Sequence, residues 1–131
     1  MRKAWVAGAG LAGCEAAWAL ANAGVQVTLY EMKPQRYSPA HRSPDFAELV
    51  CSNSFKATRH ISAAGLLKEE MRLLGSLCLA CADGSAVSAG GALAVDREEF
   101  SRRMTRKIEE HPGITVVRGE VTQIPQGEGI I

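Results

Sequence analysis

The sequence predicts an α/β fold with a parallel sheet, and three features of the first thirty residues support this prediction. Residues 4–7 form a short apolar run that is typical of a buried strand. Residues 11–23 are rich in alanine and have helical spacing, and Gly24 follows them as a C-cap residue. Residues 25–30 alternate like a second strand. This strand, helix and strand predict a Rossmann-like, three-layer domain.

The connection between the first strand and the helix is Gly8-Ala9-Gly10-Leu11-Ala12-Gly13. In such a turn Gly8 permits the tight bend, Gly10 lets a pyrophosphate approach the helix N-terminus, and Gly13 allows close packing of helix on sheet. Glu31 follows Gly13 by 18 residues, the place of an acid that accepts hydrogen bonds from ribose hydroxyls. An acid there disfavours a 2′-phosphate. The pattern predicts an FAD or NAD site, with a non-binding Rossmann unit as the alternative.

Residues 32–62 predict a long irregular connection. Three prolines exclude a long helix before residue 45, and long loops in compact domains are usually functional or disordered. Between residues 33 and 60 five basic residues oppose two acidic ones. The segment is therefore either a solvated loop or a local basic surface that faces phosphate, of a cofactor or of RNA. The basic residues are Lys33, Arg36, Arg42, Lys56 and Arg59, and the acidic ones are Asp45 and Glu48.

Cys51 lies in this segment, within the stretch LVCSNSFK. Cap-type residues follow it, and a helix that begins near Ser54 would place its positive end close to the sulfur. Helix N-termini and nearby cations lower the pKa of a thiol and favour the reactive thiolate. The residues alone leave two roles open for Cys51, which are a poised nucleophile and a buried packing residue.

Residues 63–82 have apolar positions at spacings of three and four, which predict one amphipathic helix. Cys78 and Cys81 form a CxxC pair, but no second pair and no histidine pair accompany it, so we expect core residues and no metal site. Cys14 falls within the first helix, where close packing on a sheet favours small side chains. We expect it to be structural as well.

The last third predicts strand, helix and two strands, at residues 92–95, then a helix, then 114–117 and 120–124. Asp96 is the expected N-cap, with Glu99 three residues later as in a capping box. Phe100, Met104 and Ile108 form one apolar face of this helix, and Pro112-Gly113 ends it.

Length and charge limit the class of protein. The 131 residues suffice for one domain, and 15 basic against 14 acidic residues give a net charge of +1. This balance excludes a global attraction for nucleic acid, so any RNA contact must be a local patch. We see neither a signal peptide nor an apolar run of about 20 residues, and so expect a cytoplasmic protein with reduced thiols and no membrane contact.

Five stretches together resemble one family. GAGLAGCEAAW, YEMKP, AELVCSNSFK, GLLKEEMR and GGALAVDREEFS are similar to the folate- and FAD-dependent tRNA (uracil-5-)-methyltransferases, the TrmFO family. The resemblance extends from residue 4 to about residue 125. AGCEAA also resembles the related flavoprotein that modifies wobble uridines, but residues 46–56 do not. A general FAD- or NAD-dependent oxidoreductase is the other alternative.

The resemblance implies a domain of glutathione-reductase type that binds FAD. It also implies NAD(P)H and 5,10-methylenetetrahydrofolate as co-substrates, and methyl transfer to C5 of a uridine in the tRNA T-loop. It assigns Cys51 as the catalytic residue, either as the nucleophile toward uracil or as a partner of the flavin intermediate. Val121, expected on the last strand, would offer its backbone to adenine. The implied cofactor-binding residues are Gly8, Ala9, Gly10, Leu11, Ala12, Gly13, Glu31, Met32, Lys33, Arg36 and Val121.

The chain is several times shorter than members of that family. We therefore expect an N-terminal portion of the FAD domain, incomplete and inactive in isolation. Its expected parts are the dinucleotide fingerprint at 1–31, the long loop with the reactive cysteine at 32–62, and the remaining helices and strands at 63–131.

Overall fold

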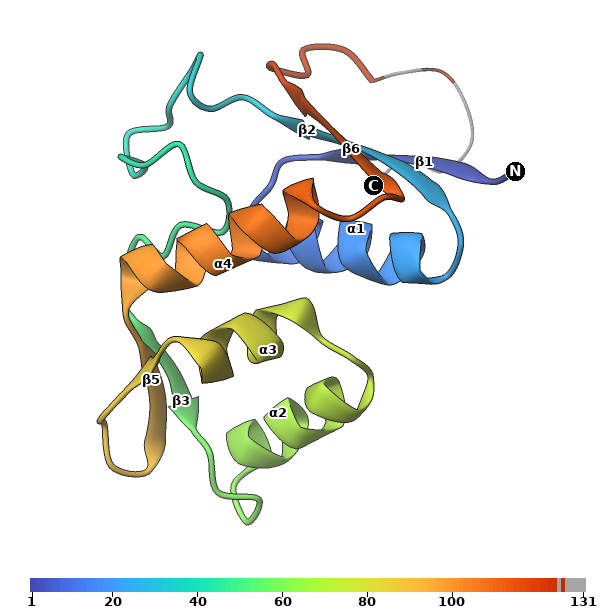
Figure 1. The fold of residues 1–131 in the computed structure, drawn as a ribbon. Helices are drawn as coiled ribbons and strands as arrows, with labels where there is room; N and C mark the ends of the chain where they lie inside the picture. The colour runs from blue at the N-terminus through green and yellow to red at the C-terminus, as the bar shows by residue number, and fades with distance from the viewer. Residues whose placement is uncertain (125, 127–131) are drawn as a thin grey trace.

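The computed structural model describes residues 1–124 and 126, and it places two small sheets around a group of four helices (Figure 1). The elements in chain order are β1 (Lys3–Ala7), α1 (Leu11–Asn22), β2 (Gln26–Glu31), β3 (Ser54–Ala57), α2 (Ala63–Leu73), α3 (Leu77–Gly84), β4 (Ala86–Val87), β5 (Ala92–Val95), α4 (Arg97–Glu109) and β6 (Ile114–Arg118).

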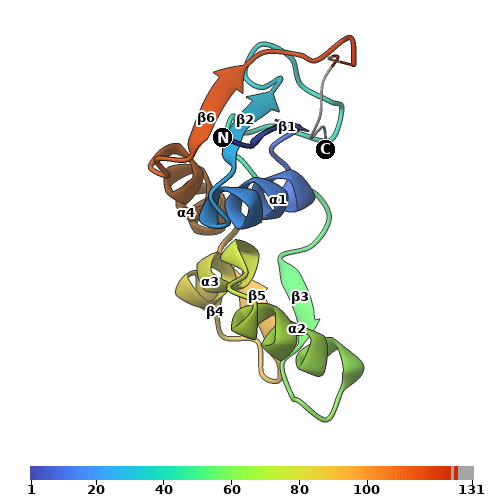
Figure 2. The ribbon, with the colours of Figure 1, turned by 90° about the vertical axis from the view of Figure 1, so that its right-hand side faces the viewer.

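The parallel sheet confirms the predicted fold class. Its strand order is β1-β2-β6, with Ala4 opposite Val27 and Val27 opposite Ile114. Helices α1 and α4 cover one face of this sheet, as Figures 1 and 2 both show. The described residues thus supply a sheet layer and a helix layer, and the third layer stays a prediction.

A second sheet, antiparallel and of order β3-β5-β4, lies at the far end of the molecule from the parallel sheet (Figure 2). Strand β5 coincides with the predicted strand at 92–95. The expectation of a helix near Ser54 is wrong, because Ser54 begins strand β3 and lies opposite Ala94. The loop predicted for residues 32–62 is therefore interrupted by this strand, whose pairing partner lies about forty residues further along the chain.

The predicted helix at 63–82 is two helices. Gly75 adopts a φ of 78°, in the left-handed region that favours glycine, and the chain turns there between α2 and α3. Ser76 then caps α3, and the carboxylate of Glu15 accepts hydrogen bonds from the Leu77 and Cys78 amides at 2.8 and 3.0 Å. Glu15 lies on α1, so a side chain distant in sequence fixes where α3 begins.

The core lies where α4 meets α1, α3 and the parallel sheet. Phe100, Met104 and Ile108 are fully buried, which confirms the predicted apolar face. Cys14, Cys78 and Cys81 are buried as expected. Asp96 caps α4 by accepting from the Glu99 amide at 2.9 Å, whereas the Glu99 carboxylate pairs with arginines one turn further on and does not return to the cap.

The second predicted strand of the last third, at 120–124, is not formed. Strand β6 ends at Arg118, and residues 119–124 continue without regular structure. Val121 is consequently not on a strand. None of the helices in the described residues is both long and apolar enough to span a membrane.

Gly13 provides a direct test of the packing of α1. A Cβ at this position would lie 1.8 Å from the carbonyl oxygen of Gly8, so the turn and the helix would have to separate. We expect Gly13→Ala to lower the free energy of unfolding by at least about 2 kcal/mol, although alanine is the better helix former. Urea denaturation measures the difference. Gly119→Ala, where a Cβ meets nothing within 4 Å, is the matched control and should leave stability nearly unchanged.

Candidate dinucleotide site

A hollow of about 360 Å³ opens at the carboxyl ends of β1 and β2, where a Rossmann-like fold binds its ligand. It lies between the glycine turn, the end of β2 and the segment that follows β6. Seven of the predicted site residues line it, namely Gly8, Ala9, Gly10, Glu31, Met32, Lys33 and Val121. The structure therefore brings together residues from both ends of the described chain.

The N-terminus of α1 is suited to an anion. Gly10 is its N-cap residue, and neither a side-chain cap nor an acidic residue in the first turn satisfies the amides there. A Cβ on Gly10 would meet nothing within 4 Å, so the space above these amides is open to a ligand. Gly8 has a φ of 96°, and its amide donates to the Tyr30 carbonyl at 2.7 Å, which fixes the turn against β2.

Glu31 is buried at the end of β2 and binds two backbone amides. One carboxylate oxygen accepts from the Ala9 amide at 2.8 Å, and the other accepts from the Lys33 amide at 2.9 Å. Each carboxylate oxygen can accept a second hydrogen bond, and Glu31 lines the hollow. The side chain thus holds the glycine turn in place and still has acceptor capacity for ribose hydroxyls.

Lys33 turns into the protein. Its ammonium donates to the carbonyls of Ser43 and Asp45 at 2.9 and 2.6 Å, and it lies 3.6 Å from a carboxylate oxygen of Glu48. Burial alone would raise the pKa of Glu48, but the amides of Arg42 and Ser43 and the charge of Lys33 outweigh it and lower that pKa. The Lys33 ammonium is therefore engaged with the loop, and only other atoms of this residue are left to meet a ligand.

The loop that Lys33 holds also contacts the glycine turn. The Ala47 amide donates to the Ala9 carbonyl at 2.8 Å, and the Phe46 amide donates to the Thr105 hydroxyl of α4 at 2.8 Å. Arg118 lies over the Phe46 ring, 4.4 Å from its centroid. Both polar groups of Ala9 are thus bonded, the amide to Glu31 and the carbonyl to Ala47, and the segment that precedes Cys51 is fixed at several points.

Cys51 is the exposed member of the four cysteines, and all four are free thiols. Burial is the main cause that raises the pKa of Cys14 to about 12, and it also raises those of Cys78 and Cys81. The predicted helix near Ser54 is absent, so no helix N-terminus activates the sulfur from that side. The Cys51 carbonyl accepts from Arg97 at 3.4 Å. The structure supports accessibility of this thiol and excludes burial.

The remaining predicted residues lie around the hollow without lining it. Leu11, Ala12 and Gly13 form the first turn of α1, and Arg36 is exposed and paired with the carboxylate of Glu120 at 2.8 Å. Sequence reasoning missed other residues of the lining, which come from the ends of β1 and β2, from the loop after β2 and from the chain after β6. These are Ala7, Tyr30, His41, Glu48, Gly119 and Glu120. Gly119 alone had a sequence signal, as a break between two expected strands.

Comparison with known proteins agrees with this geometry. The family described as glucose inhibited division protein A (GIDA) matches residues 3–131. Proteins named methylenetetrahydrofolate–tRNA-(uracil-5-)-methyltransferase TrmFO are 56% identical in Ligilactobacillus salivarius and in Bacillus subtilis, and 60% identical in Geobacter sulfurreducens. Each of these matches covers 96% of this chain and 29% of the relative. The resemblance found in the five sequence stretches is confirmed.

A solved structure supports the fold. The p-nitrophenol 4-monooxygenase PnpA from Pseudomonas putida DLL-E4 superimposes with a TM-score of 0.60 at 16% identity, over 97% of this chain and 35% of that one. At this identity the likeness shows the architecture alone. The chain spans about three tenths of the length of the curated relatives it matches. By the match over nearly its whole length, the chain belongs to the glucose inhibited division protein A family.

Proposed function

We propose that this chain is the dinucleotide-binding part of a folate- and FAD-dependent tRNA (uracil-5-)-methyltransferase. The observation that supports this most directly is the hollow that Glu31 lines together with Gly10, the N-cap residue of α1, which has no side-chain cap. The relatives that bear this name align over 96% of the chain. We extend the activity, substrates and partners that their name implies to this protein as part of the proposal.

The residues of the hollow fit FAD. The amides at the start of α1 would bind the pyrophosphate, the open space over Gly10 would admit it, and Glu31 would accept from the ribose hydroxyls. Met32 and Val121 also line the hollow, and adenine would lie against Met32 and the backbone of Val121. Arg36, which is exposed, is placed to meet phosphate once it leaves Glu120. Lys33 would act through its backbone and through the loop it holds.

The reaction needs a one-carbon unit at the methylene level to become a methyl group, which requires two electrons. Bound FAD, reduced by NAD(P)H, would supply these electrons to the unit that 5,10-methylenetetrahydrofolate donates. The chain itself has to activate the uridine, because C5 of uracil is a poor nucleophile. The Cys51 thiolate would add to C6 of the T-loop uridine, make C5 nucleophilic, and be expelled when the C5 proton leaves after methyl transfer.

Gly10→Ser tests the pyrophosphate site. Serine is at least as good an N-cap residue as glycine, so stability should not fall, but its hydroxyl would cap the amides and occupy the open space. We expect the affinity for FAD to fall by at least about tenfold, because hydrogen bonds to a charged group are lost. Titration of flavin fluorescence measures the affinity. Ala89→Ser, on the surface of another loop, is the control, and equal affinities of the two variants would contradict the proposed site.

Cys51→Ala tests the nucleophile. In the protein at its full encoded length we expect the rate of methyl transfer to fall by at least about a thousandfold. FAD absorbance and the melting temperature should stay unchanged, because the Cys51 side chain is exposed. Val50→Ala is the neighbouring control, since Val50 is 49% exposed. Full methyl transfer by Cys51→Ala would remove Cys51 from the mechanism. A protein that oxidises NAD(P)H through FAD but methylates no uridine would favour the general oxidoreductase.

Thiol labelling tests the assignment of accessible and buried cysteines. At pH 8 iodoacetamide should modify Cys51 alone in the folded protein, because burial shields the other three sulfurs and their raised pKa values leave almost no thiolate. After unfolding in urea all four cysteines should react. Mass spectrometry counts the modified residues, and equal labelling of Cys14 and Cys51 in the folded protein would contradict the structure.

A further inference from the structure

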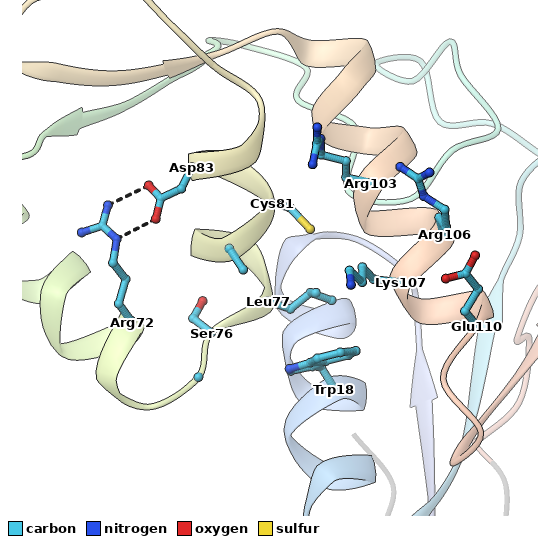
Figure 3. Close-up of a pocket in the computed structure, with 12 residues that line it drawn as sticks. Trp18, Arg72, Ser76, Leu77, Cys81, Asp83, Arg103, Arg106, Lys107 and Glu110 are labelled. Atoms are coloured by element: carbon cyan, nitrogen blue, oxygen red, sulfur yellow. Dashed lines mark hydrogen bonds and ion pairs between the residues drawn. The ribbon is translucent and has the colours of Figure 1, made fainter.

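A second and larger hollow, of about 710 Å³, lies between α1, α3 and α4 (Figure 3). It shares no lining residue with the hollow at the glycine turn. Its walls come from the middle of α1, from the turn between α2 and α3, and from the second half of α4. The volume is within the range of sites that bind small molecules or parts of larger ones.

Basic side chains of α4 form one wall of this second hollow. Arg103 lies one turn before Arg106 and Lys107, and Figure 3 shows all three beside the hollow. Arg103 donates through Nε to Glu99 at 2.9 Å. Among the described residues no carboxylate lies within 4 Å of the charged nitrogens of Arg106 or Lys107. These two cations are therefore available to a ligand from outside.

The acidic residues near the hollow are largely engaged. Asp83 accepts a two-point ion pair from Arg72 at 2.8 and 2.9 Å, drawn as dashed lines in Figure 3. Glu15 of α1, which is not among the lining residues, caps α3. Burial alone would raise the pKa of Glu15, but the hydrogen bonds from Ser76, Cys78 and Leu77 outweigh it and lower that pKa. Glu110 is the acidic residue left in the lining, so positive charge is in excess.

An aromatic ring completes the lining. Trp18 of α1 is half-buried and lies beside Leu77 and Lys107 in Figure 3. The ring of His111 meets it in a T-shaped contact, with centroids 5.1 Å apart. Bases of single-stranded nucleic acid stack on such rings, while neighbouring cations bind the phosphates.

The helix dipole gives a structural reason for part of this arrangement. Arg106 and Lys107 lie in the last turn of α4, where cations stabilise a helix. Arg103, one turn earlier, pairs with Glu99, but neither effect explains a tryptophan that lines an open hollow. The combination of unpaired cations with an aromatic wall is what a nucleotide unit requires, because its phosphate is anionic and its base is flat.

We infer that the second hollow binds one nucleotide of a single-stranded RNA segment, with the base against Trp18 and the adjacent phosphates at Arg106 and Lys107. The inference rests on the proposed function only in taking RNA as the partner. It adds a contact surface that is separate from the dinucleotide site and from Cys51. Net charge is +1 for the whole chain, so attraction of an RNA strand requires a local surplus of positive charge such as this one.

The test measures binding of a single-stranded oligoribonucleotide to the protein at its full encoded length, as a function of salt. Arg106→Gln and Lys107→Gln should each lower the slope of log affinity against log salt by about 0.7. Arg102→Gln, which removes the same charge from the same helix outside the hollow, should leave the slope unchanged. Trp18→Leu should weaken binding by about 5- to 150-fold, and Trp18→Phe should restore most of it.

The outcomes separate this inference from the proposed function. If the wild type methylates uridine and binds RNA, but Arg106→Gln and Lys107→Gln keep the wild-type slope, the second hollow is not an RNA site and the proposed function stands. If the slope of log affinity against log salt falls in those variants while the wild type methylates no uridine, the second hollow is an RNA site and the proposed function fails. Equal affinity for uridine monophosphate and for the oligoribonucleotide would overturn the RNA assignment in favour of a free nucleotide.

Discussion

The carboxylate of Glu31 is the group on which the geometry of the dinucleotide hollow depends. It binds the amide of Ala9 within the glycine turn and the amide of Lys33 beyond β2, so it joins the two strand ends that form the hollow. Because the Ala9 carbonyl is bonded in turn to Ala47, the loop that precedes Cys51 is attached to the same turn. An unpaired carboxylate at this depth would be costly, and the two amides and the hollow together make its burial tolerable.

The elements that sequence predicts well are those set by short-range patterns. The strand, helix and strand of the first thirty-one residues follow from apolar periodicity and from glycines at fixed offsets, and they are present as expected. The failures have long-range causes. Strand β3 exists because it pairs with β5, and α3 begins where it does because Glu15, on another helix, caps it. Long-range contacts also decide the site. The glycine motif identified the turn from sequence, but no local pattern shows that Lys33 points inward and binds the carbonyls of Ser43 and Asp45.

Burial divides the four cysteines into two chemical groups. Cys14, Cys78 and Cys81 pack where α1, α3 and α4 meet, and their raised pKa values follow from the loss of water around the sulfur. Cys51 lies outside this cluster, on a segment fixed by backbone contacts and by neighbouring residues and not by the cysteine side chain. The CxxC spacing of Cys78 and Cys81 is accordingly a packing pattern of a short helix, and no metal-binding cluster forms within the part of the chain that the structure describes.

The late position of β6 in the chain has a consequence for synthesis. Strand β2 has β6 as its second neighbour, and two of the contacts that hold the loop before Cys51 come from Thr105 and Arg118. On a ribosome β1, α1 and β2 emerge early, but these partners follow only after some eighty further residues. Since parallel pairing between distant strands is slow, the nascent loop can use only its contacts with Ala9 and Lys33 until the strand at Ile114 has been made.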